Sequence, residues 1–147
     1  MRQALAVIIA AVLTTTLADT ARACSCARNP TAERILQGAT TVFTGVARQS
    51  VRGAGGHSVT TFTVVESFKG AAAGATIRVL HPSGSSASCG VRFAPGETYT
   101  LAAHRAGSAP GLTATLCSTW MFSPSVGLGT GLIRRMREIR GEQERPR

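Results

Sequence analysis

The middle of the chain alternates between apolar and polar residues with the period of two that is typical of β-strands. These segments are rich in valine, threonine and phenylalanine, and stretches with glycine, proline or serine separate them. The pattern predicts strands over residues 40–52, 57–70, 76–82, 98–105 and 112–118. We expect the first two to form a long hairpin, with a bulge or bend at Gly45. Several short strands with regular turns indicate a small barrel or sandwich.

Apolar residues within the predicted strands identify the expected core. In the second strand these are Val59, Phe62, Val64 and Phe68, and in the third strand Ile77 and Val79 share one face. A domain of this size buries a modest core, so disulfide bonds would add to its stability.

Two segments carry a helical pattern instead. Residues 30–38 begin with proline, contain the apolar pair Ile35 and Leu36 and end at Gly38, which predicts one short helix. Residues 123–140 predict a second helix, whose apolar stripe comprises Leu128, Leu132, Ile133, Met136 and Ile139. We expect this stripe to pack on the strands, the alternative being an amphipathic helix on a membrane surface. Residues 141–147 are expected to be disordered.

The first 23 residues have the three parts of a secretory signal peptide. Arg2 precedes an apolar stretch over residues 4–18, and Ala21-Arg22-Ala23 matches the small-residue pattern before a cleavage site. The apolar stretch is too short and too interrupted for a comfortable membrane span, so an anchor that stays attached is the less favoured alternative. We therefore expect residues 1–23 to be removed and residues 24–122 to form one domain. The protein would then be secreted, into the extracellular space or to the exterior of the cell envelope.

The 147-residue chain is strongly basic, with 16 basic and 7 acidic residues and a formal net charge of +9. All of the basic residues except Lys69 are arginines, and outside the C-terminal segment they are scattered. Because aromatic residues are few and do not interleave with the charges, we expect no nucleic-acid binding. Weak, unspecific contact with anionic surfaces remains compatible with the charge.

Residue patterns that support catalysis are missing from the sequence. Glu33, Glu66 and Glu97 stand singly, so no paired-carboxylate signature is present, and no Ser/His/Asp or Cys/His motif stands out. The three histidines, His57, His81 and His104, are far apart in the sequence. We therefore expect no enzymatic activity, no cofactor and no metal site of the protein's own.

The four cysteines, Cys24, Cys26, Cys89 and Cys117, predict two disulfide bonds in an exported chain. A bond between Cys24 and Cys26 would strain its ring, so each should pair with a distant cysteine. Two connectivities remain open: Cys24–Cys89 with Cys26–Cys117, or Cys24–Cys117 with Cys26–Cys89. A redox role for the Cys-x-Cys pair and lipidation of Cys24 are less favoured, the latter because Ala21 and Arg22 fit a lipobox poorly.

Several of these features together resemble the N-terminal, netrin-like domain of the tissue inhibitors of metalloproteinases. The matching stretches are Cys24-Ser25-Cys26 with the following Pro30, and residues 64–70, 85–103 and 111–118. They occur in the same order and span roughly residues 24–120. The resemblance implies an all-β fold with flanking helices, namely a five-stranded OB-fold (Greek-key) barrel. It also implies the pairing Cys24–Cys89 and Cys26–Cys117.

The resemblance further implies a secreted, monomeric inhibitor whose partner is a zinc metalloproteinase. In that family the α-amino nitrogen and carbonyl oxygen of the first mature residue, here Cys24, bind the target's catalytic zinc. The second residue, here Ser25, enters the specificity pocket beside the zinc. The resemblance places further contacts on a ridge formed by Cys26, Ala27, Arg28, Ser86, Ala87 and Ser88.

The chain also departs from the animal inhibitors, which have a third disulfide in this domain and a second, cysteine-rich domain. Arg28 places a cation in the ridge where those proteins usually carry less charge. The same disulfides could therefore serve a structural role alone. The alternative function is a non-inhibitory netrin-like binding or envelope module that holds a protein or a polyanion.

Overall fold

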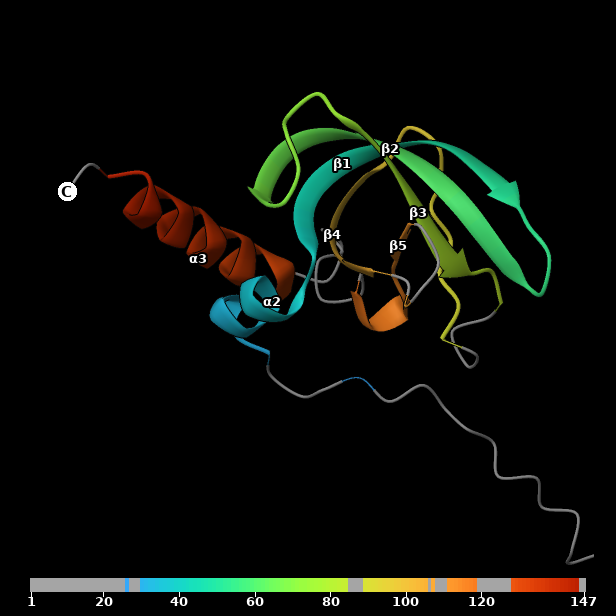
Figure 1. Cartoon of the computed structure of the whole chain (residues 1–147), viewed down its shortest axis with the longest axis horizontal. Coiled ribbons are helices and arrows are strands. Elements are labelled where there is room, and N and C mark those ends of the chain that lie inside the picture. The colour runs from blue at the N-terminus through green and yellow to red at the C-terminus, as the bar shows by residue number, and fades with distance from the viewer. Residues whose placement is uncertain are drawn as a thin grey trace, which may run out of the picture.

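The protein is a closed five-stranded barrel with two helices packed together on one side (Figure 1). The computed structural model describes Cys26 and residues 30–84, 89–105, 107, 111–118 and 128–145. The strands are β1 (Thr41–Arg52), β2 (His57–Lys69), β3 (Thr76–Pro82), β4 (Thr98–Arg105) and β5 (Leu112–Thr113). The predicted fold class, an all-β, OB-like barrel with flanking helices, is confirmed.

Strand pairing closes the barrel in the order β1-β2-β3-β5-β4. β1 is antiparallel to both β2 and β4, and β3 is antiparallel to β2. The short β5 completes the ring, parallel to β3 and antiparallel to β4. The pairing of β1 with β2 shifts register between Thr44 and Gly45, which confirms the predicted irregularity there.

The fifth strand is shorter than the predicted 112–118, because residues 116–118 form a 3-10 helix, η3. The N–H of Ala114 still donates to the Leu80 carbonyl at 3.0 Å, and the chain then turns. Ser118 closes this turn, since its N–H donates to the Thr115 carbonyl and its Oγ accepts from the Thr115 N–H. A periodic sequence pattern does not reveal such a side-chain-stabilised turn.

The barrel interior is built around aromatic side chains. Phe62 and Phe93 lie edge-to-face with their ring centroids 5.0 Å apart, and Phe43 and Tyr99 pack beside them in the same geometry. Val64 is also buried, as predicted. Val59 is not, and its prediction as a core residue is wrong. Because side chains alternate along a strand, the residues that face inward with Phe62 and Val64 are Thr60 and Ser58.

A second apolar cluster lies between the outer face of the barrel and the two helices, α2 (Ala32–Gly38) and α3 (Leu128–Gln143). Its buried members come from α2 and the residue after it, from three strands and from α3, and are Ala32, Ile35, Ala39, Val42, Phe68, Ala102 and Met136. Lys69 holds the end of α2, since its ammonium donates to the carbonyls of Leu36 at 2.6 Å and Ala39 at 2.7 Å. These bonds satisfy carbonyls that the end of a helix leaves without partners.

Helix α3 confirms the predicted apolar face, with Leu132, Ile133, Met136 and Ile139 packed in the second cluster. Its end differs from the prediction, because the helix continues to Gln143 rather than stopping at residue 140. Residues 141–143, which were predicted to be disordered, are therefore helical. Arg140 holds this last turn, since it donates to the Ser67 carbonyl. Residues 123–127 of the predicted helix lie outside the described residues. Neither described helix is long and apolar enough to cross a membrane.

Candidate functional site

The start of the described chain is attached to the barrel by a disulfide bond between Cys26 and Cys117. The two Cα atoms are 5.3 Å apart although 91 positions separate them in the sequence. Cys117 lies in η3, directly after the strand that closes the barrel. This bond is the one that the resemblance implied, and it excludes the alternative in which Cys26 pairs with Cys89.

The loop that carries Cys89 lies against the same segment. The N–H of Leu116, next to Cys117, donates to the Cys89 carbonyl at 3.1 Å. Cys89 has a φ of 59°, which makes it the one non-glycine residue in the described part of the chain with left-handed backbone. The structure thus brings Cys26, Cys89 and Cys117 together at one place, and none of the described cysteines is a free thiol.

The two ends of the Cys89 loop are closely joined at its base. The N–H of Val91 donates to the Pro82 carbonyl at 3.0 Å. Gly90 packs so closely on the backbone of Gly84 that a Cβ at Gly90 would collide with it. Ser83 connects this base to the β1–β2 turn, since both its N–H and its hydroxyl donate to the Gly56 carbonyl, at 2.9 and 2.8 Å. The described residues on either side of this loop therefore form a closed base.

Most of the predicted site residues lie outside the described part of the chain. Cys26 is described and half-buried, whereas Cys24, Ser25, Ala27, Arg28, Ser86, Ala87 and Ser88 are not described. The zinc-chelating role of Cys24, the pocket role of Ser25 and the Cys24–Cys89 pairing stay predictions. The structure describes the segments that would hold the predicted site in place. These are the Cys26–Cys117 bond and the base of the Cys89 loop, which we call the support of the site.

A cleft of about 400 Å³ opens beside this support, between α2 and the ends of β4 and β5. Its walls include Pro30 and Ile35 on one side and His104, Thr113 and Cys117 on the other. The described residues that follow Cys26 thus enter α2 along the edge of a hollow rather than over a flat surface.

The histidines occupy three different environments. His104 is exposed at the end of β4, and exposed His57 bonds the Gly55 carbonyl through Nδ1 at 2.9 Å. His81 is buried and bonded through Nε2 to the Thr60 hydroxyl at 2.8 Å. Burial lowers the pKa of the His81 imidazole. Within the described residues, no three His, Cys, Asp or Glu side chains lie close enough to hold a metal ion.

The sequence reasoning missed this polar layer of Ser58, Thr60 and His81 inside the barrel. A signal for it was present, because Phe62 and Val64 set the inward positions of β2, and the same alternation points Thr60 and Ser58 inward. Val59 is apolar, but it lies between the inward positions Ser58 and Thr60 and has the opposite orientation.

Comparison with known proteins assigns neither a family nor a function to this arrangement of residues. The chain matches no model of a known protein family, and no curated protein matches it. The resemblance to the netrin-like domain therefore depends on the motifs quoted above.

Proposed function

We propose that this protein is a secreted inhibitor of zinc metalloproteinases that acts through the N-terminus of its mature chain. The observation that carries the proposal is the Cys26–Cys117 disulfide, which attaches the chain to the barrel three residues after the predicted cleavage site at Ala23. A disulfide is compatible with an extracellular location. The first residue after cleavage would be Cys24, with a free α-amino group.

The chemistry requires a rigid bidentate ligand. The α-amino nitrogen and the carbonyl oxygen of Cys24 would close a five-membered chelate ring on the target's zinc and displace its water. The amine must be unprotonated to bind, and an α-amino group with an ordinary pKa of about 8 loses its proton readily. Ser25 would then point into the specificity pocket next to the zinc.

The Cys26–Cys117 bond suits this chemistry because it would order the chain end before the target binds. A free chain end would have to be ordered on binding, and that cost would weaken the affinity. The disulfide at Cys26 fixes the chain next to Cys117, and it would thereby limit the volume open to the two residues before it. The Cys89 loop, joined to the same segment through Leu116, is the natural second contact. Ala27 and Arg28 would extend the ridge toward the target, and Arg28 would favour a target with acidic residues near its zinc.

The experiment compares the mature chain starting at Cys24 with the same chain preceded by one alanine, on a panel of zinc metalloproteases. The added residue converts the chelating amine into an amide and leaves both disulfides possible. Loss of a zinc ligand should weaken inhibition by about 100-fold or more, since removing even outer-shell partners of a metal costs 10–100-fold. Equal inhibition by both chains, or inhibition by neither, would contradict the proposal for that panel. Disulfide mapping of both chains provides the folding control.

A second candidate is a non-inhibitory module that holds an acidic protein or a polyanion. It is favoured by Arg48, Arg78 and Arg105, which are exposed on the strands and form no ion pair with any described residue. Binding of this kind would fall steeply with salt and would be the same for both chains of the experiment above.

A further inference from the structure

The barrel interior changes from apolar to polar toward the end that carries the β1–β2 turn. Phe62 and Val79 belong to the aromatic core, and the next inward positions on their strands are Thr60 and His81, which are 1% and 2% exposed. Ser58 follows, also buried. We call this polar end of the interior, with the residues that border it, the barrel mouth. Figure 1 shows the β1–β2 turn on the side of the barrel away from the helices.

Strand register explains why polar groups converge here. On β2, Thr60 is paired with Ser50 of β1, and Ser58 is paired with Arg52 of β1 and with His81 of β3. Directly paired residues place their side chains on the same face of a sheet. All five residues therefore lie on the face that continues the barrel interior.

A chain of hydrogen bonds runs outward through this layer. Nε2 of His81 is bonded to Oγ1 of Thr60 at 2.8 Å, and Thr60 donates to Oγ of Ser50 at 3.0 Å. Ser50 is exposed, and because it accepts from Thr60, its own hydroxyl proton can be donated to a ligand. Residues with no role in the proposed inhibition thus supply a fixed donor at the opening of the barrel.

The mouth contains a cavity of about 310 Å³. Its described walls include Ser50, Arg52, Ser58, His81, Arg92 and Phe93. A cavity of this size is at the lower end of the range for small-molecule sites, of about 300–1,000 Å³, and barrel mouths are frequent places for such sites. One wall is apolar and the rim is cationic.

The two arginines at the rim have no acidic partner among the described residues. Arg52 and Arg92 are exposed and form no ion pair there. The described acidic residues, except Glu97, lie on or beside the helices: Glu33, Glu66, Glu138, Glu142 and Glu144. The rim is therefore a positive region next to a hollow, which attracts a negatively charged ligand.

We propose that the barrel mouth binds a small organic anion. Arg52 and Arg92 hold its carboxylate or phosphate group, since guanidinium groups bind both in a bidentate geometry. Ser50 donates an additional hydrogen bond, and the body of the ligand packs against Phe93. The site is separate from Cys24 and Ser25, so it stands or falls independently of metalloproteinase inhibition.

The test is a titration of the ¹⁵N-labelled mature protein with three probes at constant ionic strength: benzoate, phenyl phosphate and inorganic phosphate. We expect saturable amide shifts confined to residues 50–58, 81–83 and 91–93. Tighter binding of benzoate or of phenyl phosphate identifies the preferred anion group. A lack of saturation with all three probes would overturn the proposal.

Matched arginine variants separate the cavity from general surface charge. Arg52→Gln and Arg92→Gln should each weaken binding of the best probe by about 10-fold or more, the range expected for losing a charge-assisted hydrogen bond. Arg78→Gln removes the same charge from the outer face of β3 and should change the affinity less than about 2-fold. Equal weakening by all three substitutions would show surface electrostatics alone and contradict the site. Thermal unfolding of each variant provides the folding control.

Discussion

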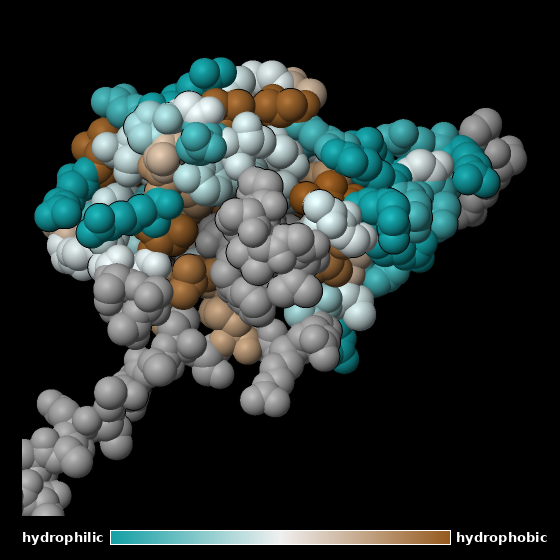
Figure 2. All heavy atoms as spheres, turned by 180° about the vertical axis from the view of Figure 1, so that it is seen from behind, coloured by the Kyte–Doolittle hydropathy of each residue, from teal (hydrophilic) through white to brown (hydrophobic). Residues whose placement is uncertain are grey.

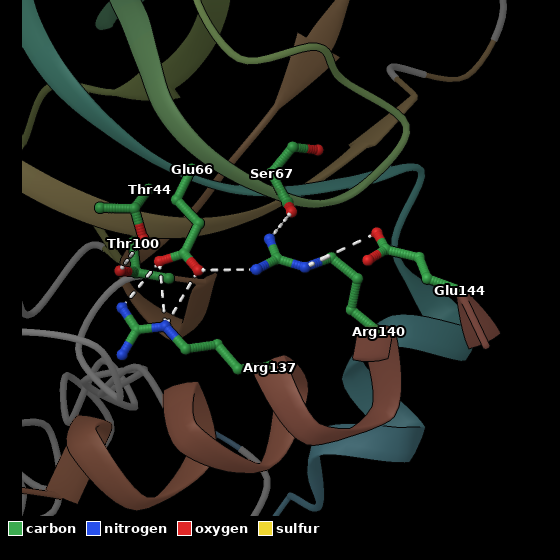
Figure 3. A network of polar contacts seen from close by, with 7 residues as sticks. All are labelled: Thr44, Glu66, Ser67, Thr100, Arg137, Arg140 and Glu144. Atoms are coloured by element: carbon green, nitrogen blue, oxygen red, sulfur yellow. Dashed lines mark hydrogen bonds and ion pairs between the residues drawn. The ribbon is translucent and has the colours of Figure 1, made fainter. Parts of the chain in front are cut away.

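The helical side of the molecule and the barrel mouth differ in whether their arginines form ion pairs. Beside α3 three arginines are paired: Arg137 and Arg140 both contact Glu66 of β2, at 2.7 and 3.2 Å, and Arg135 contacts Glu33 of α2 at 2.8 Å. Figure 3 shows the Glu66 carboxylate between the two guanidinium groups, with Arg140 also reaching the Ser67 carbonyl. At the mouth, Arg52 and Arg92 have no such partner among the described residues.

The difference shows which cations have a structural role. Hydrophilic side chains cover the helical side in Figure 2, and they lie over the second apolar cluster. There Arg135, Arg137 and Arg140 attach a helix whose apolar face already packs on the barrel. The mouth has polar groups inside and cations at the rim, so its charges are available to a ligand. A basic sequence thus contains two populations of arginine that composition does not distinguish.

The largest expected effect concerns the apolar cluster under the helices. Met136→Ala removes a fully buried side chain between α3, α2 and the barrel, and should lower the free energy of unfolding by about 2–5 kcal/mol. The control on the mouth side is Val51→Ala, whose side chain is 55% exposed and whose loss should change stability by about 0.5 kcal/mol or less. Denaturant unfolding of the disulfide-intact protein measures both. Similar losses for both variants would mean that the helical side has no special part in stability.

An intermediate effect is expected for the ion pairs. Glu66→Gln removes the carboxylate shared by Arg137 and Arg140, and should cost about 1–2 kcal/mol because these bonds are charge-assisted and the Glu66 side chain is only 20% exposed. Hydrogen exchange in α3 should also speed up. Glu97→Gln is the matched control: Glu97 is exposed, forms no ion pair with a described residue, and should have almost no effect. The assignment of a structural role to these arginines fails if the two variants unfold alike.

The smallest expected effect is on the pH dependence of stability, which should differ between the barrel mouth and the helical side. Burial lowers the pKa of His81 from its ordinary value of 6.5, so as pH falls below 6.5 the unfolded chain binds a proton that the folded chain resists, and stability decreases. Hydrogen bonding from Arg137 lowers the pKa of Glu66 from 4.5, so its contribution is present above pH 4.5 and is lost below it. As pH falls, the stability that the barrel mouth contributes should therefore decrease before the stability that the Glu66 ion pairs contribute.

Stability measured between pH 7.5 and 5 in the wild type and in His81→Phe tests this order. The variant lacks the titrating group, so its stability should depend less on pH in that window, whereas Glu66→Gln should keep the wild-type slope there. A wild-type slope in His81→Phe would show that His81 does not cause the loss of stability.

Local patterns in the sequence were sufficient for most of the fold. Alternation placed β1 to β4 within one residue of their observed ends, because a period of two requires only neighbouring residues. The stripe of Leu132, Met136 and Ile139 likewise predicted the buried face of α3. The sequence also predicted that the cysteines of the candidate site form disulfide bonds. The residues alone left two disulfide pairings open.

Tertiary structure decided what depends on residues distant in the chain. The choice of Cys117 as the partner of Cys26 is one case, since the entropy of closing long loops barely discriminates between the pairings. The early end of β5, the attachment of α3 to Glu66 and the polar layer of Thr60 and His81 are others. Each arises from hydrogen bonds or packing between segments that only the closed barrel brings together. The sequence by itself therefore determined the elements and the positions of the cysteines, and the closed barrel decided which side chains meet.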